Sequence, residues 1–138
     1  AELAQKIKER FERYEMIKAN EARAEEYLVN DAEIVLVAYG ATSRIVRSAV
    51  NSARAKGIKA GLIRPQTLWP YPSAVVAKAA QTAKVFLTVE MSMGQMVEDV
   101  RLAVNGKAPV SFFGRTGGVI PTPAEVLAEI EKLAGGDQ

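Results

Sequence analysis

The sequence predicts a three-layer α/β/α domain with a mainly parallel sheet of four or five strands, preceded by an N-terminal helix. Short continuous apolar runs are typical of strands that are buried on both faces, and they occur at 34–39, 58–63, 85–89 and 109–113. A segment with helical spacing of apolar residues follows each run, and such alternation requires parallel strands with helices on both faces. The 138 residues are enough for one domain with a substantial core.

The first 30 residues predict a charged amphipathic helix that precedes an α/β domain over residues 31–138. Their apolar residues recur every three or four positions and form one stripe: Leu3, Ile7, Phe11, Tyr14 and Ile17. Two interpretations carry equal weight. The helix either packs against the domain edge or a neighbour, or it is a solvated linker.

The first strand-to-helix turn lies at residues 40–43. Gly40 makes the turn, and Thr42 or Ser43 is placed to cap a helix that ends at a left-handed Gly57. The same turn resembles a phosphate-binding loop, although it has neither the dinucleotide fingerprint nor the Walker lysine. Because every helix must satisfy its first N–H groups, the structural interpretation is favoured.

The remaining boundaries follow from turn and cap residues. Three prolines hold 64–72 extended, and Ser73 is placed to cap a short helix that runs to about residue 82. The segment 105–106 (NG) stops the next helix. The segment 122–125 (TPAE) has the pattern of a capping box with proline at the first helical position, so the last helix starts there.

Composition narrows the function classes. The sequence has no cysteine and no histidine, so it lacks thiolate nucleophiles and the commonest general base and metal ligands. A net charge of +2 without a basic tract predicts no nucleic-acid partner, and no apolar run is long enough for a membrane span. We expect a cytoplasmic protein, and the missing initial methionine fits a processed chain or a piece of a longer polypeptide.

The segment 84–104 (KVFLTVEMSMGQMVEDVRLAV) predicts a strand, a short loop and a helix, with Glu90 at the carboxyl end of the strand. In open α/β sheets ligands and partners meet this end of the strands. Glu90 is interpreted either as a structural or interface hydrogen-bonding group, which is favoured, or as a proton donor or acceptor. Met91, Met93 and Met96 either form an apolar contact patch or fill the core, and the patch is slightly favoured.

A second glycine-rich loop, 114–118 (GRTGG), follows the last predicted strand. Its Arg115 and exposed backbone N–H groups suit an anion. Loop geometry alone explains such a segment more often than not, and it is the favoured interpretation.

Taken together, these segments resemble one protein family in their order and spacing. The set is 31–40 (DAEIVLVAYG), 57–64 (GIKAGLIR), 68–72 (LWPYP), 89–91 (VEM), 94–96 (GQM) and 114–123 (GRTGGVIPTP). The chain resembles the C-terminal, transketolase C-terminal-like domain of the alpha subunit of 2-oxoacid:ferredoxin oxidoreductases. The 2-oxoisovalerate (2-ketoisovalerate) and 2-oxoglutarate enzymes are the nearest in character, and branched-chain oxoacid is preferred.

The resemblance implies an architectural domain of a larger enzyme that decarboxylates a 2-oxoacid on thiamine diphosphate, reduces ferredoxin and releases an acyl-CoA. Thiamine diphosphate, Mg²⁺ and the iron–sulfur clusters would lie on other domains or on the beta subunit. No catalytic, cofactor-binding or metal-binding residue of the family maps onto this chain. The implied partners are the remainder of the alpha subunit and the thiamine-binding beta subunit, in an oligomer that uses ferredoxin and CoA.

On this interpretation the strand-end loops form the contact surface. The candidate interface residues are Tyr39, Thr42, Ser43, Arg64, Trp69, Tyr71, Glu90, Met91, Met93, Gln95 and Arg115. Two rivals remain: a small nucleotide- or CoA-binding module that uses the loops at 40–43 or 114–118, and a stand-alone interaction protein.

Overall fold

The computed structural model describes residues 23–67, 71–91, 95–114 and 120–135. Nine elements alternate along this part of the chain: β1 (Ala24–Tyr27), β2 (Ile34–Val37), α2 (Thr42–Ala55), β3 (Ala60–Pro65), α3 (Ser73–Ala79), β4 (Val85–Glu90), α4 (Gln95–Val104), β5 (Val110–Gly114) and α5 (Pro123–Ala134). The four predicted apolar runs therefore correspond to β2, β3, β4 and β5.

The strands form one sheet in the order β1-β3-β2-β4-β5. The pairs β2–β3, β2–β4 and β4–β5 are parallel, and β1 pairs with β3 antiparallel. The prediction of a mainly parallel sheet in an α/β domain is confirmed. The predicted helix over residues 1–22 lies outside the described residues.

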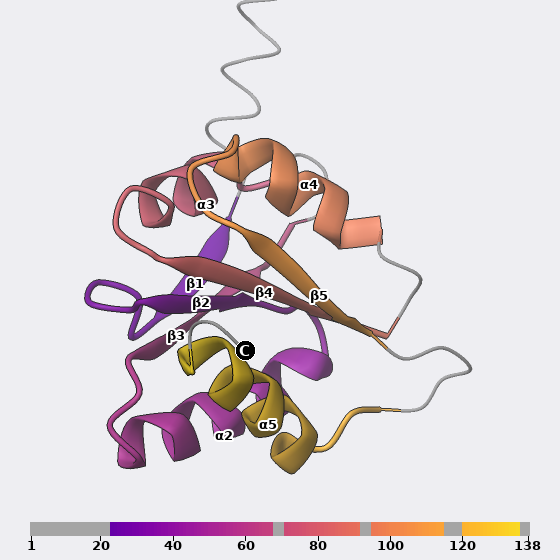
Figure 1. The fold of residues 1–138 in the computed structure, drawn as a ribbon. Helices are drawn as coiled ribbons and strands as arrows, with labels where there is room; N and C mark the ends of the chain where they lie inside the picture. Colours follow the sequence, from indigo (N-terminus) through magenta and orange to yellow (C-terminus); the bar gives the residue numbers. More distant parts are fainter. Residues whose placement is uncertain (1–22, 68–70, 92–94, 115–119, 136–138) are drawn as a thin grey trace, which may run out of the picture.

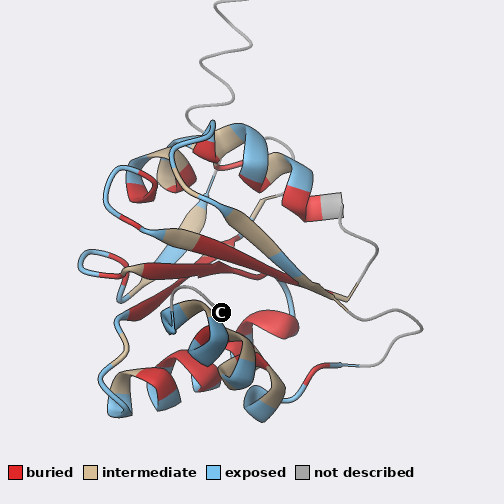
Figure 2. Ribbon diagram, viewed as in Figure 1, coloured by how far each residue is buried: buried red, intermediate tan, exposed pale blue. Residues whose placement is uncertain are grey.

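Helices cover both faces of the sheet (Figure 1): α3 and α4 lie on one face, and α2 and α5 on the other. Alternate residues of each strand point to opposite faces, so two buried clusters form. In β4, Phe86 packs in the cluster under α3 and α4, whereas Leu87 and Val89 pack in the cluster above α2 and α5. Figure 2 shows β2 buried throughout and β4 buried beyond its first residue, as expected of strands covered on both faces.

The prediction of a helix through residue 30 is wrong at its C-terminal end, where Ala24–Tyr27 form β1. Each of the four residues is paired with β3, and Glu25 lies opposite Arg64 in the register. Sheet pairing thus overrides the helical propensity of this short segment.

Arg54 stabilises the turn that follows β1. Its guanidinium donates to the backbone oxygens of Leu28 and Ala60, both at 2.8 Å, and pairs with the Asp31 carboxylate at 2.7 Å. This hydrogen bond and charge lower the pKa of Asp31.

The helix ends are partly as predicted. The capping box at Thr122 and Glu125 is present in both directions, and Gly57 has the expected positive φ of 84°. Two predicted caps are wrong, because Thr42 and Ser73 are the first residues of α2 and α3 rather than caps, and neither helix has a side-chain cap. The Ser43 hydroxyl instead donates to the Gly40 backbone oxygen at 2.6 Å.

Candidate functional site

The carboxyl ends of β2, β3, β4 and β5 meet at one edge of the sheet, because these strands are parallel. We call this the carboxyl edge; it comprises residues 38–44, 64–67, 90–91 and 114. In Figure 1 the arrowheads of β4 and β5 point toward it. Six of the predicted contact residues lie within these ranges: Tyr39, Thr42, Ser43, Arg64, Glu90 and Met91.

Glu90 ends β4 and holds the first turn of α4. One carboxylate oxygen accepts from the Met96 backbone N–H at 2.7 Å, and the other accepts from the Val97 N–H at 3.1 Å. The first N–H groups of a helix have no partner within the helix, and their partial positive charge favours a carboxylate. Glu90 is only 7% exposed. The structural hydrogen-bonding interpretation of Glu90 is confirmed.

Two buried hydroxyl groups occur on the same side of the sheet as Glu90. Tyr71 and Thr88 are both buried, and neither hydroxyl has a hydrogen-bond partner among the described residues. Burial raises the pKa of Tyr71 well above its ordinary value, and the Asp99 and Glu90 carboxylates add to this effect. Tyr71 therefore stays neutral and contributes apolar surface to the core under α3 and α4.

The predicted contact residues divide by exposure. Tyr39 is 50% exposed, and Arg64 and Met91 are half-buried. Four others are buried inside this domain and offer little side-chain surface to a partner: Thr42, Ser43, Tyr71 and Glu90. Trp69, Met93 and Arg115 lie outside the described residues, as does the side chain of Gln95. Met96 is buried in the core, so the core-filling interpretation holds for this methionine.

A basic cleft opens at the carboxyl edge between β3 and the start of α2. We call it the arginine cleft; its volume is about 580 Å³, and it is lined by Glu25, Gly40, Ala41, Ser43, Arg44, Arg47, Leu62 and Arg64. Three arginines and one glutamate are thus among the residues that line it. The structure brings together Ser43 and Arg64 of the predicted residues here, and separates them from Tyr71 and Glu90 on the other face.

Neighbouring side chains hold two of the arginines of this cleft, Arg47 and Arg64. Glu25 pairs with Arg64 at 3.4 Å and with Arg47 at 3.9 Å. The Arg47 guanidinium also lies 4.1 Å from the centroid of the Tyr27 ring, a favourable cation–π arrangement. The Tyr27 hydroxyl in turn donates to Asn51 at 2.6 Å.

Sequence reasoning missed Glu25, Arg44 and Arg47. The arginines are three residues apart at the start of a predicted helix, so their position on one face could have been found. Glu25 could not, because its place depends on the pairing of β1 with β3.

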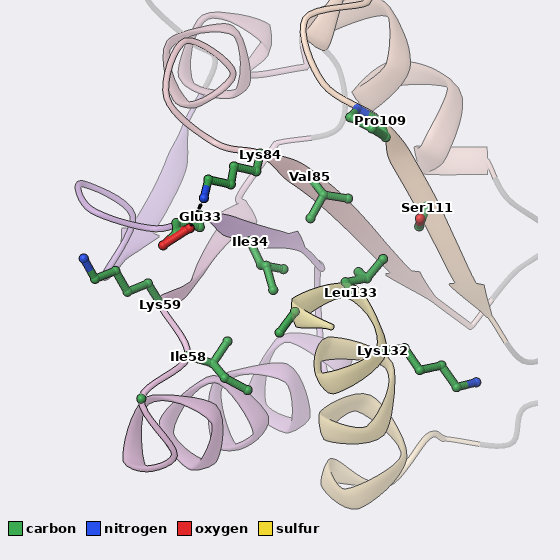
Figure 3. Close-up of a pocket in the computed structure, with 12 residues that line it drawn as sticks. Glu33, Ile34, Ile58, Lys59, Lys84, Val85, Pro109, Ser111, Lys132 and Leu133 are labelled. Atoms are coloured by element: carbon green, nitrogen blue, oxygen red, sulfur yellow. Dashed lines mark ion pairs between the residues drawn. The ribbon is translucent and has the colours of Figure 1, made fainter. Parts of the chain in front are cut away.

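A second cleft lies at the opposite edge of the sheet, beside the amino ends of β2 and β4 (Figure 3). Its volume is about 690 Å³, and apolar side chains such as Ile34, Ile58 and Leu133 face it. Lys84 pairs with Glu33 at 2.7 Å on its rim, and this lysine, with Lys59, lowers the pKa of Glu33. This partly apolar cleft has no counterpart among the sequence predictions.

Among the described helices, none is both long enough and apolar enough to cross a bilayer. The described residues also contain no group of three or more His, Cys, Asp or Glu side chains placed to hold a metal ion.

Comparison with known proteins gives a consistent result. Residues 32–126 match the family model of pyruvate:ferredoxin oxidoreductase core domain II. The chain is 51% identical over 124 residues to ketoisovalerate oxidoreductase subunit VorB of Methanothermobacter thermautotrophicus. The aligned region covers 90% of this chain and 35% of that protein. The chain therefore spans about a third of the length of this curated relative.

Two solved structures are similar in fold. The first is 2-oxoglutarate:ferredoxin oxidoreductase from Magnetococcus marinus with 2-oxoglutarate, coenzyme A and succinyl-CoA bound. Its TM-score is 0.71 and its sequence identity is 25%, and the match covers 80% of this chain and 19% of that one. The second is a split-gene transketolase, an inactive beta4 tetramer, at a TM-score of 0.69 and 19% identity over 84% of this chain and 42% of that one. The transketolase-like fold expected from the sequence agrees with this second neighbour.

Proposed function

Because this chain belongs to the pyruvate:ferredoxin oxidoreductase core domain II family, we propose that it is the architectural and assembly domain of a thiamine-diphosphate-dependent 2-oxoacid:ferredoxin oxidoreductase. The parent complex would oxidatively decarboxylate a 2-oxoacid to an acyl-CoA and reduce ferredoxin. This domain would itself carry no step of that reaction. We further propose 2-oxoisovalerate as the substrate, which the name of the VorB relative supports.

The observation that supports the non-catalytic role is the hydrogen bonding of the Glu90 carboxylate. It is the carboxylate that ends β4 at the carboxyl edge, where a reacting group would be expected. Both of its oxygens accept backbone N–H groups of α4. Its hydrogen bonds therefore serve the fold.

The residues of this chain also do not fit the redox groups of the parent complex. Iron–sulfur clusters are held mainly by cysteine thiolates, and the sequence contains no cysteine. We propose that the clusters, thiamine diphosphate and Mg²⁺ are bound by other domains or by the beta subunit.

This proposal predicts that the chain alone is inactive. The 138-residue chain, mixed with thiamine diphosphate, Mg²⁺, CoA, 2-oxoisovalerate and an electron acceptor, should form no acyl-CoA above a protein-free blank. The complete complex under the same conditions is the positive control. Acyl-CoA formation by the chain alone would refute the non-catalytic role.

We propose that a docking surface at the carboxyl edge, comprising Tyr39, Arg64 and Met91, contacts the rest of the alpha subunit and the beta subunit. Exposed aromatic and arginine side chains dominate the binding energy of many interfaces. Trp69, Met93, Gln95 and Arg115 belong to the same proposal.

Replacing Tyr39 with aspartate should weaken assembly at least about tenfold, because truncated or charged interface aromatics commonly cost more than about 1.4 kcal/mol. The matched control is Leu102→Asp, since Leu102 is 77% exposed but lies in the last turn of α4. Co-purification of each variant with the remaining subunits measures the effect. If Leu102→Asp fails to assemble and Tyr39→Asp succeeds, the docking surface lies elsewhere.

A nucleotide- or CoA-binding module is the second candidate function. One observation favours it, which is the position of the arginine cleft at the loop 40–43. The other proposed loop, 114–118, lies almost wholly outside the described residues.

A further inference from the structure

We propose that the arginine cleft binds a phosphate group. The ligand would be a phosphate-bearing small molecule, and the shared chemistry is a tetrahedral oxyanion that presents several acceptor oxygens. The inference rests on the second candidate function and deepens it, and it is argued from described residues of this chain.

The first argument is the arrangement of donors around one cavity. Arg44 and Arg47 come from α2, whereas Arg64 comes from β3, so arginines from two elements line the same cleft. A single guanidinium fork already satisfies a planar carboxylate with two parallel hydrogen bonds. Three arginines around one volume therefore suit an anion with more acceptor oxygens, and phosphate has that chemistry.

The second argument is that two of the arginines are held in position before a ligand arrives. Arg47 lies over the Tyr27 ring, which is tied to Asn51, and Arg64 is paired with Glu25 directly across the β1–β3 ladder. Holding long side chains in place lowers the conformational entropy lost on binding. Arg44 differs, since its side chain is exposed and makes no hydrogen bond or ion pair with the described residues.

The third argument is the charge balance. One carboxylate, that of Glu25, stands against the three arginines that line the cleft, and it pairs with Arg47 and Arg64. The cleft therefore keeps an excess of positive charge. Its volume of about 580 Å³ leaves room for a group larger than phosphate alone.

The test is a titration of the 138-residue chain, followed by the amide and arginine side-chain resonances of residues 40–47. The probes are inorganic phosphate, pyrophosphate and ADP, with acetate at equal ionic strength as the comparison. We expect saturable shifts with a dissociation constant of about 1 mM or tighter for at least one probe, and much weaker shifts with acetate. Tightest binding of phosphate indicates a free anion, whereas tightest binding of pyrophosphate or ADP indicates a phosphoanhydride ligand.

Three variants sharpen the test. Arg44→Gln should weaken binding about fivefold, and Glu25→Gln should tighten it by about threefold or more, because each changes one charge beside the anion. Arg101→Gln is the matched control: it removes one positive charge from α4, on the other face of the sheet, and should leave binding unchanged. Melting temperatures within about 2 °C of the parent would show that the variants fold.

Three results would overturn the proposal. They are the absence of saturable shifts with all three phosphate probes, equal shifts with acetate, and equal weakening by Arg44→Gln and Arg101→Gln.

Discussion

Replacement of Glu90 by alanine is expected to lower the free energy of unfolding by about 3 kcal/mol. The substitution removes both acceptors of the Met96 and Val97 N–H groups, which lie in a buried site. A hydrogen bond to a charged group contributes about 1.5–3 kcal/mol, and a buried donor left without a partner costs about 1–3 kcal/mol. The start of α4 should therefore loosen, and assembly through the adjacent docking surface should weaken with it.

Glu90→Gln is the matched comparison, because it keeps the shape and one acceptor oxygen but loses the negative charge. Its loss of stability should fall between those of the parent and the alanine variant. Urea unfolding of the isolated chain measures both losses, and co-purification with the remaining subunits measures assembly. An alanine variant with unchanged stability and unchanged assembly would contradict the capping role.

Replacement of Phe86 by alanine should cost about 3–5 kcal/mol, the range for truncation of a buried aromatic residue. Among the described residues, Phe86 is the largest fully buried side chain, and it lies in β4, which is paired on both sides. Its ring fills the core under α3 and α4. The closely packed surroundings can collapse only partly, so a cavity should remain.

Phe112→Ala provides the control within the same sheet. Phe112 is 40% exposed and belongs to β5, which is an edge strand among the described residues. Its removal should cost less than about 1.5 kcal/mol, because part of its surface is already in contact with water and it belongs to neither buried cluster. Urea unfolding again measures both, and equal losses would mean that the assignment of the core is wrong.

The main elements of this fold were accessible to sequence reasoning because their signals are local. A run such as 85–89 is apolar on both faces, and the TPAE segment at 122–125 contains both partners of its capping box. Each of these signals lies within a few residues of the structure it specifies. The positive φ at Gly57 follows from the same kind of local chemistry.

The errors occurred where a distant partner decides the outcome. Residues 24–27 are of types that favour a helix, yet they form a strand because they pair with β3. Thr42 and Ser73 have the chemistry of caps, but each is the first residue of its helix, and neither helix has a side-chain cap.

For the candidate sites too, some features could be predicted from the sequence and others only from the folded structure. Composition and motif order were enough to indicate the family, the parallel sheet and the position of Glu90 at a strand end, because these depend on residue type and spacing along the chain. The hydrogen bonds of Glu90 to α4 and the gathering of Glu25, Arg44, Arg47 and Arg64 around one cleft required the folded chain. Contacts between residues up to about forty positions apart depend on strand register and helix placement. Register and placement are fixed only when the whole core packs.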